Sequence, residues 1–375
     1  MHWGIDAQRL AGQRLGVGRY IEYLLREWDR CANGDDQVTL FVRDPLAGGD
    51  ATLGLSPRFA VRHLRPRLTG QLWQNVVLPR HARHLDVLFC PSYSMPLGFD
   101  RPCVVAIHSV NEVEDGTHPW WYNLTYSQVY RLSARRADRV IVPSESTSRD
   151  LQALYGVPAE KIDVVPQGAD EVFQPITDSR RLAEIRRELV GADVPYVVFV
   201  GKLSQRRNIP ALLEAFAILK RRTRAPHKLL LFGPNHLELP IARIAAKLAV
   251  GDSVVQTDGR VANHADLVPV YGAADLYVNA SLYEGFSMTL VEALSCGTPV
   301  VGVRRGAVQE IADGCAVLVD EPEPQALASA MERVLTDDAL RADLRQRSVQ
   351  RAAAFRWDKT ARQTLDVLRR VVVQS

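Results

Sequence analysis

Two glutamates, Glu284 and Glu292, flank the start of a short predicted helix that runs from Met288 to about Cys296. At a rise of about 1.5 Å per helical residue, the two carboxylates lie roughly one sugar-phosphate unit apart. Unbonded N–H groups near Ser287–Leu290, with the helix dipole behind them, would bind an anion between the carboxylates. This arrangement suits a phosphorylated sugar, with one carboxylate on a sugar and the other on a ribose.

Turn-forming residues on both sides of this helix support the site. Ser287 is a candidate N-cap, Gly297 is a candidate left-handed terminator, and Pro299 prevents the helix from continuing. Taken alone, Glu284 would be expected to be a solvated loop residue and Glu292 an exposed helix residue. The succession of strand, loop, helix and stop favours the anion site over that simpler interpretation.

A second candidate for phosphate chemistry is the basic loop that carries Lys202 and Arg207. The loop follows a predicted buried strand and precedes an amphipathic helix, Ile209–Lys220. Two cations beside a helix N-terminus would hold a diphosphate and stabilise it as a leaving group. A basic loop that only stays solvated is the alternative.

Buried parallel strands are needed to position these residues, and the chain supplies them twice. Continuous apolar runs alternate with helical patterns, which is typical of doubly wound parallel sheets. The predicted strands are His2–Asp6, Val38–Arg43, Asp86–Cys90, Cys103–His108, Arg139–Pro143, Asp163–Pro166, Tyr196–Gly201, Lys228–Phe232, Ser253–Gln256, Asp275–Ala280, Pro299–Val303 and Ala316–Val319. The polar segment Glu171–Gly191 separates the two halves. We predict two α/β domains whose carboxyl-edge loops surround one cleft.

The bulk composition narrows the class of protein. A length of 375 residues suits two domains, and 47% hydrophobic with 24% charged residues is typical of soluble proteins. The net charge of +3 is too small to favour nucleic acid as a partner. No apolar run approaches the roughly 18–20 residues that span a bilayer. Residues 1–6 lack the basic region of a signal peptide, and the five cysteines are scattered. We therefore expect a cytoplasmic protein.

The pattern Glu284-x7-Glu292, followed by Ala-Leu-Ser-Cys-Gly-Thr-Pro-Val-Val, resembles the hallmark of family 4 glycosyltransferases, which have the GT-B fold of two Rossmann-like domains. The resemblance implies that Glu284 contacts hydroxyls of the donor sugar and that Glu292 binds the nucleotide ribose. It also implies that the sugar and diphosphate are contacted by backbone groups of Gly285, Phe286, Met288 and Thr289.

The resemblance covers nearly the whole chain. The family usually has Gly-Arg followed by a Lys where this chain has Lys202 and Arg207, so the charge is kept. The segment Val254–Tyr271, with Gly259 and Arg260, is similar to the family's segment near the nucleotide base. Phe355-Arg356-Trp357 opens a last helix that in the family crosses back onto the N-terminal domain. The implied domains are 1–172 on the acceptor side, 190–355 on the nucleotide-sugar side, and the helix 356–375.

Two features of the N-terminal half also resemble the family. Gly16 and Gly18 are similar to a glycine pair at which backbone approaches the donor phosphate, and a plain turn is the alternative. Ile21 stands where a dinucleotide fingerprint needs its third glycine, so a nicotinamide site is disfavoured. His108 matches the family's His-Asp near the reacting centre, although Ser109 replaces the Asp. A satisfied structural histidine is the alternative for His108.

Two further segments have open interpretations. The cluster Trp120-Trp121-Tyr122 would pack in a core by default, or stack on a sugar or meet a membrane interface. The basic run Arg131–Arg139 offers a surface for peripheral membrane attachment.

The predicted activity is a retaining, metal-independent glycosyl transfer to a saccharide or lipid-linked saccharide, as in surface polysaccharide synthesis. No Asp-x-Asp occurs in the chain, so no metal or other cofactor is expected. By association with relatives, GDP-mannose is the first expected donor and UDP-sugars the second. A nucleotide-sugar epimerase, a phosphorylase-like enzyme and a non-catalytic sugar-nucleotide-binding protein on the same fold remain alternatives.

Overall fold

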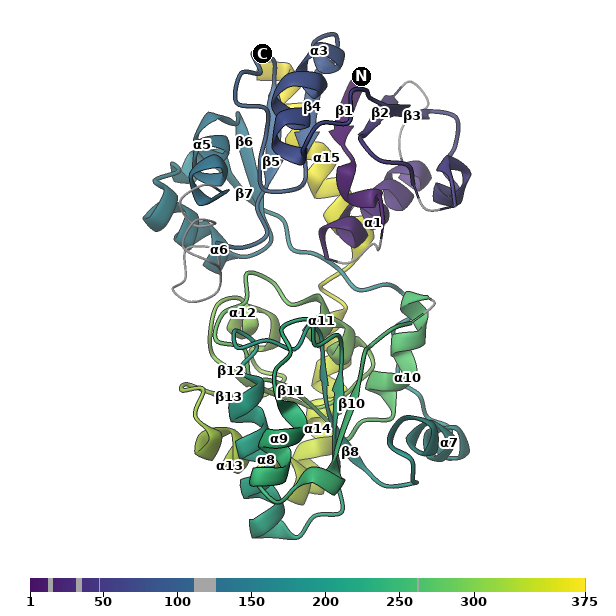
Figure 1. Ribbon diagram of the computed structural model, residues 1–375, viewed down its shortest axis with the longest axis vertical. Helices are drawn as coiled ribbons and strands as arrows, with labels where there is room; N and C mark the ends of the chain where they lie inside the picture. Colours follow the sequence, from purple (N-terminus) through teal and green to yellow (C-terminus); the bar gives the residue numbers. More distant parts are fainter. Residues whose placement is uncertain (13–15, 32–35, 47, 111–125, 262, 375) are drawn as a thin grey trace. The chain divides into compact units, whose positions relative to one another are not determined.

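The computed structural model describes residues 1–12, 16–31, 36–46, 48–110, 126–261 and 263–374. These residues form two compact units, which Figure 1 shows coloured along the sequence. Unit 1 comprises Met1–Gln167 and Trp357–Ser375, and unit 2 comprises Gly168–Arg356. The chain therefore completes unit 1 only after it has traversed all of unit 2.

Unit 1 is built on a seven-stranded parallel sheet with the strand order β3-β2-β1-β4-β5-β6-β7. Its strands are β1 His2–Asp6, β2 Gln37–Val42, β3 Phe59–His63, β4 Val87–Cys90, β5 Cys103–Ala106, β6 Arg139–Val142 and β7 Ile162–Val164. Its main helices are α1 Val17–Cys31, α2 Gly70–Leu72, η3 Trp73–Val77, α3 Leu78–Ala82, α5 Gln128–Arg136, α6 Glu145–Asp150, η6 Leu151–Tyr155 and α15 Trp357–Gln374.

The C-terminal helix α15 is an integral part of unit 1 and lies along α1 (Figure 1). The rings of Tyr23 and Trp357 stack with centroids 4.8 Å apart and an interplanar angle of 8°. The indole Nε1 of Trp28 donates a 2.8 Å hydrogen bond to the carbonyl of Ala361. Apolar side chains along one face, such as Leu368, are fully buried. Burial of this face anchors α15 because it removes aromatic and aliphatic surface from water.

Unit 2 has a six-stranded parallel sheet with the order β10-β9-β8-β11-β12-β13. Its strands are β8 Tyr196–Val200, β9 Lys228–Phe232, β10 Val254–Thr257, β11 Leu276–Asn279, β12 Val300–Val303 and β13 Val317–Val319. Its main helices are α7 Ser179–Val190, α8 Ile209–Thr223, α9 Ile241–Lys247, η9 His264–Asp266, α10 Leu267–Gly272, α11 Met288–Ser295, α12 Val308–Ala312, α13 Pro324–Thr336 and α14 Asp338–Ala352.

Both faces of the unit 2 sheet are covered, which is why its strands read as continuous apolar runs. Within β8, Tyr196 and Val198 belong to one hydrophobic cluster, whereas Val197 and Phe199 belong to the other. Helices α7, α10, α11 and α12 contribute to the first cluster, and α8, α9 and α13 to the second. The predicted fold of two doubly wound parallel sheets is confirmed.

Two local features differ from the sequence prediction. Strand β3 was not predicted, because this edge strand buries only Phe59 and carries mostly exposed side chains instead of an apolar run. The polar segment expected to separate the halves contains helix α7, whose Ile185 and Val190 are buried in unit 2. Because the apolar stripe of α7 is narrow and lies among charged residues, the composition of this segment alone predicts a linker. Unit 2 begins at Gly168, before this helix.

Candidate functional site

The candidate site in unit 2 lies in the loops that follow the carboxyl ends of its strands, the usual ligand edge of an open α/β sheet. The loop after β11 carries Glu284 and leads into α11, while the loop after β8 carries the arginine pair Arg206 and Arg207. A backbone hydrogen bond of 2.9 Å from Leu282 N to the Arg206 carbonyl joins the two loops. The structure thereby brings together the acidic and basic residues that the sequence placed far apart.

The carboxylate of Glu284 is buried and pairs with both guanidinium groups. Arg207 Nη1 contacts Glu284 Oε1, and Arg206 Nη1 lies 3.7 Å from Glu284 Oε2. Arg206 Nη1 also donates to the carbonyl of Tyr283 at 2.7 Å, and Arg207 Nη1 donates to Ser281 Oγ at 3.3 Å. Because a buried carboxylate needs compensating charge, this arginine pair allows Glu284 to stay ionised under the loop.

The guanidinium of Arg207 carries its charge at an energetic cost. Burial, together with the neighbouring charge of Arg206, lowers the pKa of Arg207 to about 9. The group remains protonated at neutral pH, since that value is still above 7. A cation that is short of solvent stabilises a nearby anion more strongly than a solvated one does. Arg207 is therefore suited to hold an anionic ligand next to Glu284.

Gly306, in the loop after β12, packs closely against the backbone of Glu284. A Cβ added at Gly306 would lie 2.2 Å from the carbonyl oxygen of Glu284, and the residue has a φ of 55°. The next residue, Ala307, donates its N–H to that same carbonyl at 2.8 Å. Only glycine fits this close approach, so the position of the Glu284 loop depends on Gly306.

The N-terminus of α11 presents backbone amides that its own N-cap residue does not satisfy. Ser287 occupies the N-cap position with extended dihedral angles, but its hydroxyl makes no capping hydrogen bond. Instead Ser287 Oγ accepts from Asn279 Nδ2 and contacts Thr289 Oγ1, both at 3.3 Å. The expected capping role of the Ser287 side chain is therefore wrong. The amides of Met288 and Thr289 precede the first intrahelical bond and can receive an anion.

Leu290 is an exception to the expected set of unbonded amides. Its N–H donates to the Ser287 carbonyl at 3.1 Å, because the first turn of α11 is tight. The helix ends as predicted, since Gly297 adopts a left-handed φ of 67°.

Glu292 is buried inside α11 and has two strong hydrogen-bond partners. The hydroxyl of Tyr271 donates to Glu292 Oε2 at 2.8 Å, and His264 Nε2 lies 2.9 Å from Glu292 Oε1. Both partners come from the continuous segment η9–α10. Burial, and then the nearby charge of Glu292, raise the pKa of Tyr271, so its hydroxyl remains a donor. The carboxylate plane of Glu292 is fixed from both sides.

Three glycines bring the loops after β8, β9 and β10 into backbone contact. A Cβ on Gly233 would lie 1.9 Å from the Gly201 carbonyl oxygen, and one on Gly259 would lie 2.5 Å from Gly233 Cα. Two basic side chains next to this contact, Lys202 and Arg260, are exposed, and Arg260 pairs with Asp258 at 2.9 Å.

In unit 1, His108 lies just after β5 and both of its ring nitrogens are engaged. Nε2 lies 2.9 Å from the carbonyl of Pro91 and must donate to it, which leaves Nδ1 to accept from Gln167 Nε2 at 2.9 Å. The rings of Tyr20 and Tyr93 pack edge-on against it. Burial lowers the pKa of His108 to about 4. The ring is neutral and holds three segments of unit 1 together.

Acid should therefore destabilise unit 1 through His108. The pKa of an unfolded histidine is about 6.5, so the unfolded chain takes up a proton that the folded chain refuses between pH 6.5 and 4. We expect His108→Gln to abolish about 3 kcal/mol of acid-dependent loss of unfolding free energy across that window. Urea titrations at pH 7 and pH 4, monitored by tryptophan fluorescence, measure it. An equal pH dependence of the unfolding free energy in His108→Gln and the wild type would contradict the assignment. His81→Gln is the control, because His81 is exposed and its replacement should leave that pH dependence unchanged.

The remaining predicted residues of unit 1 are less informative. Gly16 has a φ of 50° directly before α1, and Gly18 is buried in the first turn of that helix. Ser109 Oγ lies 3.3 Å from Tyr93 Oη. The aromatic residues 120–122 lie outside the described residues.

The basic run Arg131–Arg139 is largely used inside unit 1. Arg135 Nε donates to the carbonyl of Tyr155 at 2.6 Å, Arg136 donates to the carbonyl of Leu97, and Arg139 pairs with Asp163 at 2.7 Å. These arginines stabilise the ends of strands and helices, and Arg135 and Arg136 remain exposed to solvent.

Sequence reasoning missed four residues of the unit 2 site. Arg206 was hidden in the Arg206-Arg207 doublet, of which only the second member was selected. Ser281 carried no signal of its own. His264 and Tyr271 lie seven positions apart on one segment, a spacing of about two helical turns that places both on one face.

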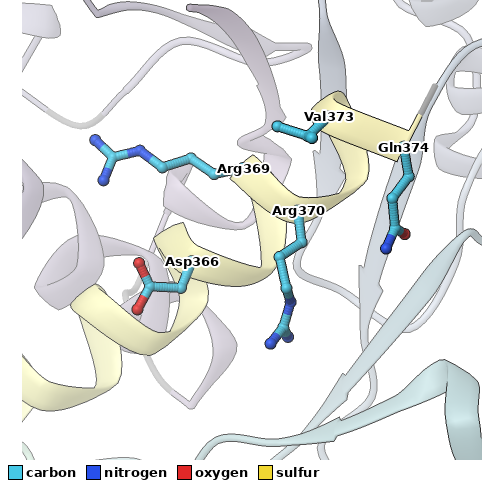
Figure 2. Close-up of a pocket in the computed structure, with 5 residues that line it drawn as sticks. All are labelled: Asp366, Arg369, Arg370, Val373 and Gln374. Atoms are coloured by element: carbon cyan, nitrogen blue, oxygen red, sulfur yellow. The ribbon is translucent and has the colours of Figure 1, made fainter.

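A cavity of about 410 Å³ lies on α15 and is lined by Asp366, Arg369, Arg370, Val373 and Gln374 (Figure 2). Arg369 pairs with Asp36 at 3.2 Å and Arg370 with Asp163 at 2.5 Å, so both cations are already neutralised. No helix in the described part of the chain is long and apolar enough to cross a membrane.

Comparison with known proteins covers both units. Residues 15–173 match the family model described as Glycosyltransferase Family 4, and residues 181–351 match the model described as Glycosyl transferases group 1. The D-inositol 3-phosphate glycosyltransferase of Salinispora arenicola is 30% identical over 390 residues, which cover 92% of this chain and 85% of that protein. The corresponding protein of Corynebacterium urealyticum is 33% identical over 62% of this chain, and the chain spans only 57% of its length.

A more distant relative and two solved structures extend the comparison. The O-antigen chain mannosyltransferase B of Escherichia coli is 25% identical over 61% of this chain and 60% of that protein. Sucrose-phosphate synthase from Thermosynechococcus elongatus superposes with a TM-score of 0.79 and 21% identity over the full length of both chains. Anabaena HepE, solved in complex with UDP-glucose, gives a TM-score of 0.77 and 19% identity over 98% of each chain. These two likenesses show a shared fold.

Proposed function

This chain belongs to the group 1 glycosyltransferases of family 4, and from that premise we propose that it transfers a hexose from a nucleotide diphosphate sugar to an acceptor hydroxyl with retention of configuration. The GT-B architecture is the one that the sequence predicted. The observation that carries the proposal is the ion-paired Glu284 beside the uncapped N-terminus of α11. The pair offers an acceptor for sugar hydroxyls, and the helix offers amides for a diphosphate.

The proposed chemistry is displacement on one face of the sugar. The acceptor hydroxyl attacks the anomeric carbon as the bond to the diphosphate oxygen breaks, and the acceptor proton passes to the departing phosphate. Lys202, Arg207 and the amides of Met288 and Thr289 stabilise the charge that develops on that phosphate. Glu284 holds hydroxyls of the sugar, while the buried Glu292 holds the ribose. His108, whose ring nitrogens are both bonded, orients its loop instead of exchanging protons.

Donor binding is proposed to exchange the partners of the two buried charges. The pair between Arg207 and Glu284 compensates the buried carboxylate. When a donor binds, the diphosphate supplies a new anion for Arg207 and the sugar hydroxyls supply new donors for Glu284. Both charges therefore keep partners throughout the cycle.

We propose GDP-mannose as the first donor to test, with UDP-sugars second, and synthesis of a surface polysaccharide or glycoconjugate as the setting. A mannosyltransferase among the relatives supports the first choice, and the UDP-glucose complex of a fold neighbour supports the second. The position of Gly259 and Arg260 after β10 suits contact with the base. No metal is proposed, since the site offers cations and amides for the diphosphate.

Glu292→Ala is expected to weaken nucleotide binding by about 1.5–3 kcal/mol, the range for hydrogen bonds to a charged group. Calorimetric titration of GDP, UDP, ADP and dTDP, with EDTA present throughout, measures the loss and identifies the base. Glu214→Ala is the matched control, because Glu214 is an exposed helical glutamate of the same unit. Unchanged affinity in Glu292→Ala would remove Glu292 from the site, and binding that requires a divalent ion would refute metal independence.

Turnover assays separate the proposal from its rivals. A nucleotide-sugar epimerase converts the donor without any acceptor, a phosphorylase-like enzyme needs pyridoxal phosphate, and a binding protein gives no product at all. Transfer that depends on an added acceptor supports glycosyl transfer. Analysis of the product by NMR then tests retention.

We also propose a cytoplasmic enzyme that meets a lipid-linked acceptor at a membrane surface. The segment 51–85 of unit 1 contains no acidic residue. On its helical part, Leu72 and Val76 are exposed by 54% and 39%, and Arg80 and Arg83 continue the same exposed side. Among the described residues, neither arginine pairs with an acidic side chain. Exposed apolar and basic side chains along one helix suit an anionic bilayer.

Charge reversal at this face, Arg80→Glu with Arg83→Glu, is expected to weaken binding to anionic vesicles by more than about tenfold, since each basic residue contributes about 1 kcal/mol near such a surface. Sedimentation with vesicles of phosphatidylglycerol and of phosphatidylcholine measures it. The double variant Arg221→Glu with Arg224→Glu, on an exposed part of unit 2, is the control. Equal binding by both double variants would contradict this face.

A further inference from the structure

The buried carboxylate of Glu292 is held by a histidine to which the family resemblance gave no role. His264 Nε2 lies 2.9 Å from Glu292 Oε1, and because a carboxylate only accepts, Nε2 carries the proton and donates. The other partner, Tyr271, is fully buried, whereas the side chain of His264 keeps 16% of its exposure. Of these two partners of Glu292, His264 is therefore the one that solvent reaches.

The position of His264 is itself fixed by the surrounding backbone. It is the first residue of the short helix η9, whose N-terminus is stabilised by a reciprocal capping box between Asn263 and Asp266. The ring packs edge-on against Phe173, with centroids 4.9 Å apart, and Phe173 is buried in the unit 2 core. A ring that is restrained by its backbone and by a neighbouring ring loses little entropy when it orients a carboxylate.

We infer that His264 is a positioning residue that orients Glu292 toward the ribose hydroxyls and so sets the preference for ribonucleotides over deoxyribonucleotides. The inference rests on the proposed function, in which Glu292 binds the ribose. Tyr271 holds one carboxylate oxygen and His264 holds the other, so the carboxylate presents its remaining directions in a single orientation. Loss of the His264 bond frees Oε1 to rotate away from the ribose.

The test separates positioning from general support of the fold. His264→Phe keeps an aromatic ring against Phe173 but removes the N–H donor, whereas His264→Gln keeps an N–H donor. Calorimetry with GDP and UDP, and with their 2′-deoxy and 3′-deoxy forms, gives a ratio of ribo to deoxy affinities. The ratio should fall about tenfold in His264→Phe, the size of one charge-assisted hydrogen bond, and should be restored in His264→Gln.

His227→Phe is the matched control, since it makes the same substitution in unit 2 directly before the amino end of β9. It should leave the ratio unchanged. A uniform loss of affinity for ribo and deoxy forms in His264→Phe, with an unchanged ratio, overturns the inference and leaves the proposed function standing. If neither GDP nor UDP binds the wild type at millimolar concentration, the proposed nucleotide site fails together with the inference. If Glu292→Ala keeps the wild-type ratio, the ribose contact itself is refuted.

Discussion

Replacing Arg207 by alanine is expected to lower kcat/KM by about 100-fold, because one charge-stabilising donor contributes on the order of 3 kcal/mol in the transition state. The same change leaves the buried Glu284 with only the more distant Arg206, at 3.7 Å. Breaking a buried ion pair from one side costs about 3–5 kcal/mol of unfolding free energy. The variant should therefore lose both activity and stability, and each loss has its own measurement.

A double-mutant cycle separates these two effects. Glu284→Gln removes the charge that Arg207 compensates, so the double variant Arg207→Ala with Glu284→Gln should recover much of the stability of unit 2 but none of the activity. Steady-state kinetics and urea unfolding of all four proteins complete the cycle. Lys202→Ala should lower activity without lowering stability, because the Lys202 side chain is exposed. Near-normal turnover in both Arg207→Ala and Lys202→Ala would refute the proposed stabilisation of the leaving phosphate.

Trp357→Ala is expected to destabilise unit 1 by about 3–5 kcal/mol, the usual cost of truncating a buried aromatic side chain. It removes the stack on Tyr23 and loosens the start of α15 on α1. All six tryptophans of the sequence lie in unit 1, so tryptophan fluorescence reports the unfolding of that unit alone. The remaining tryptophans should show a lower urea midpoint in the variant.

Nucleotide binding provides an independent reading of unit 2 in the same variant. The side chains and amides to which the proposed mechanism assigns the ribose and the diphosphate belong to unit 2, so calorimetric affinity for the nucleoside diphosphate should stay near the wild-type value. Val373→Ala is the control on the same helix, because Val373 is 87% exposed and should leave the midpoint unchanged. An unchanged midpoint in Trp357→Ala would show that α15 adds little to unit 1.

The parts of the fold that could be predicted were those in which local and global signals agree. Buried parallel strands such as Lys228–Phe232 form continuous apolar runs, and the helix from Met288 is closed by Gly297. Strand β3 could not be predicted in this way, since pairing with β2 and not an apolar pattern defines it. Helix α7 was hidden because its buried stripe is narrow and its other residues are charged.

The candidate site shows the same limit at the level of single side chains. Sequence spacing selected Glu284 and Glu292, but the partners of these carboxylates come from other loops, and no local pattern joins Arg206 or His264 to them. The hydroxyl of Ser287 turns away from the helix because Asn279 and Thr289 engage it. From its type alone His108 could be a residue near the reacting centre or a structural histidine, and only the three-dimensional contacts reveal that both of its ring nitrogens are bonded. The roles of the site residues in catalysis and binding stay predictions.

The return of the chain to unit 1 has a consequence for how the protein is made. A ribosome releases unit 2 completely before residues 357–374 emerge, so unit 2 can fold while the first-made part of unit 1 still lacks α15. Throughout that interval the aromatic face of α1, with Tyr23 and Trp28, has no helix to cover it. Nascent chains with such exposed apolar surface are the ones that aggregate or engage chaperones. Unit 1, although its first 167 residues are synthesised first, is thus completed only when α15 has been made.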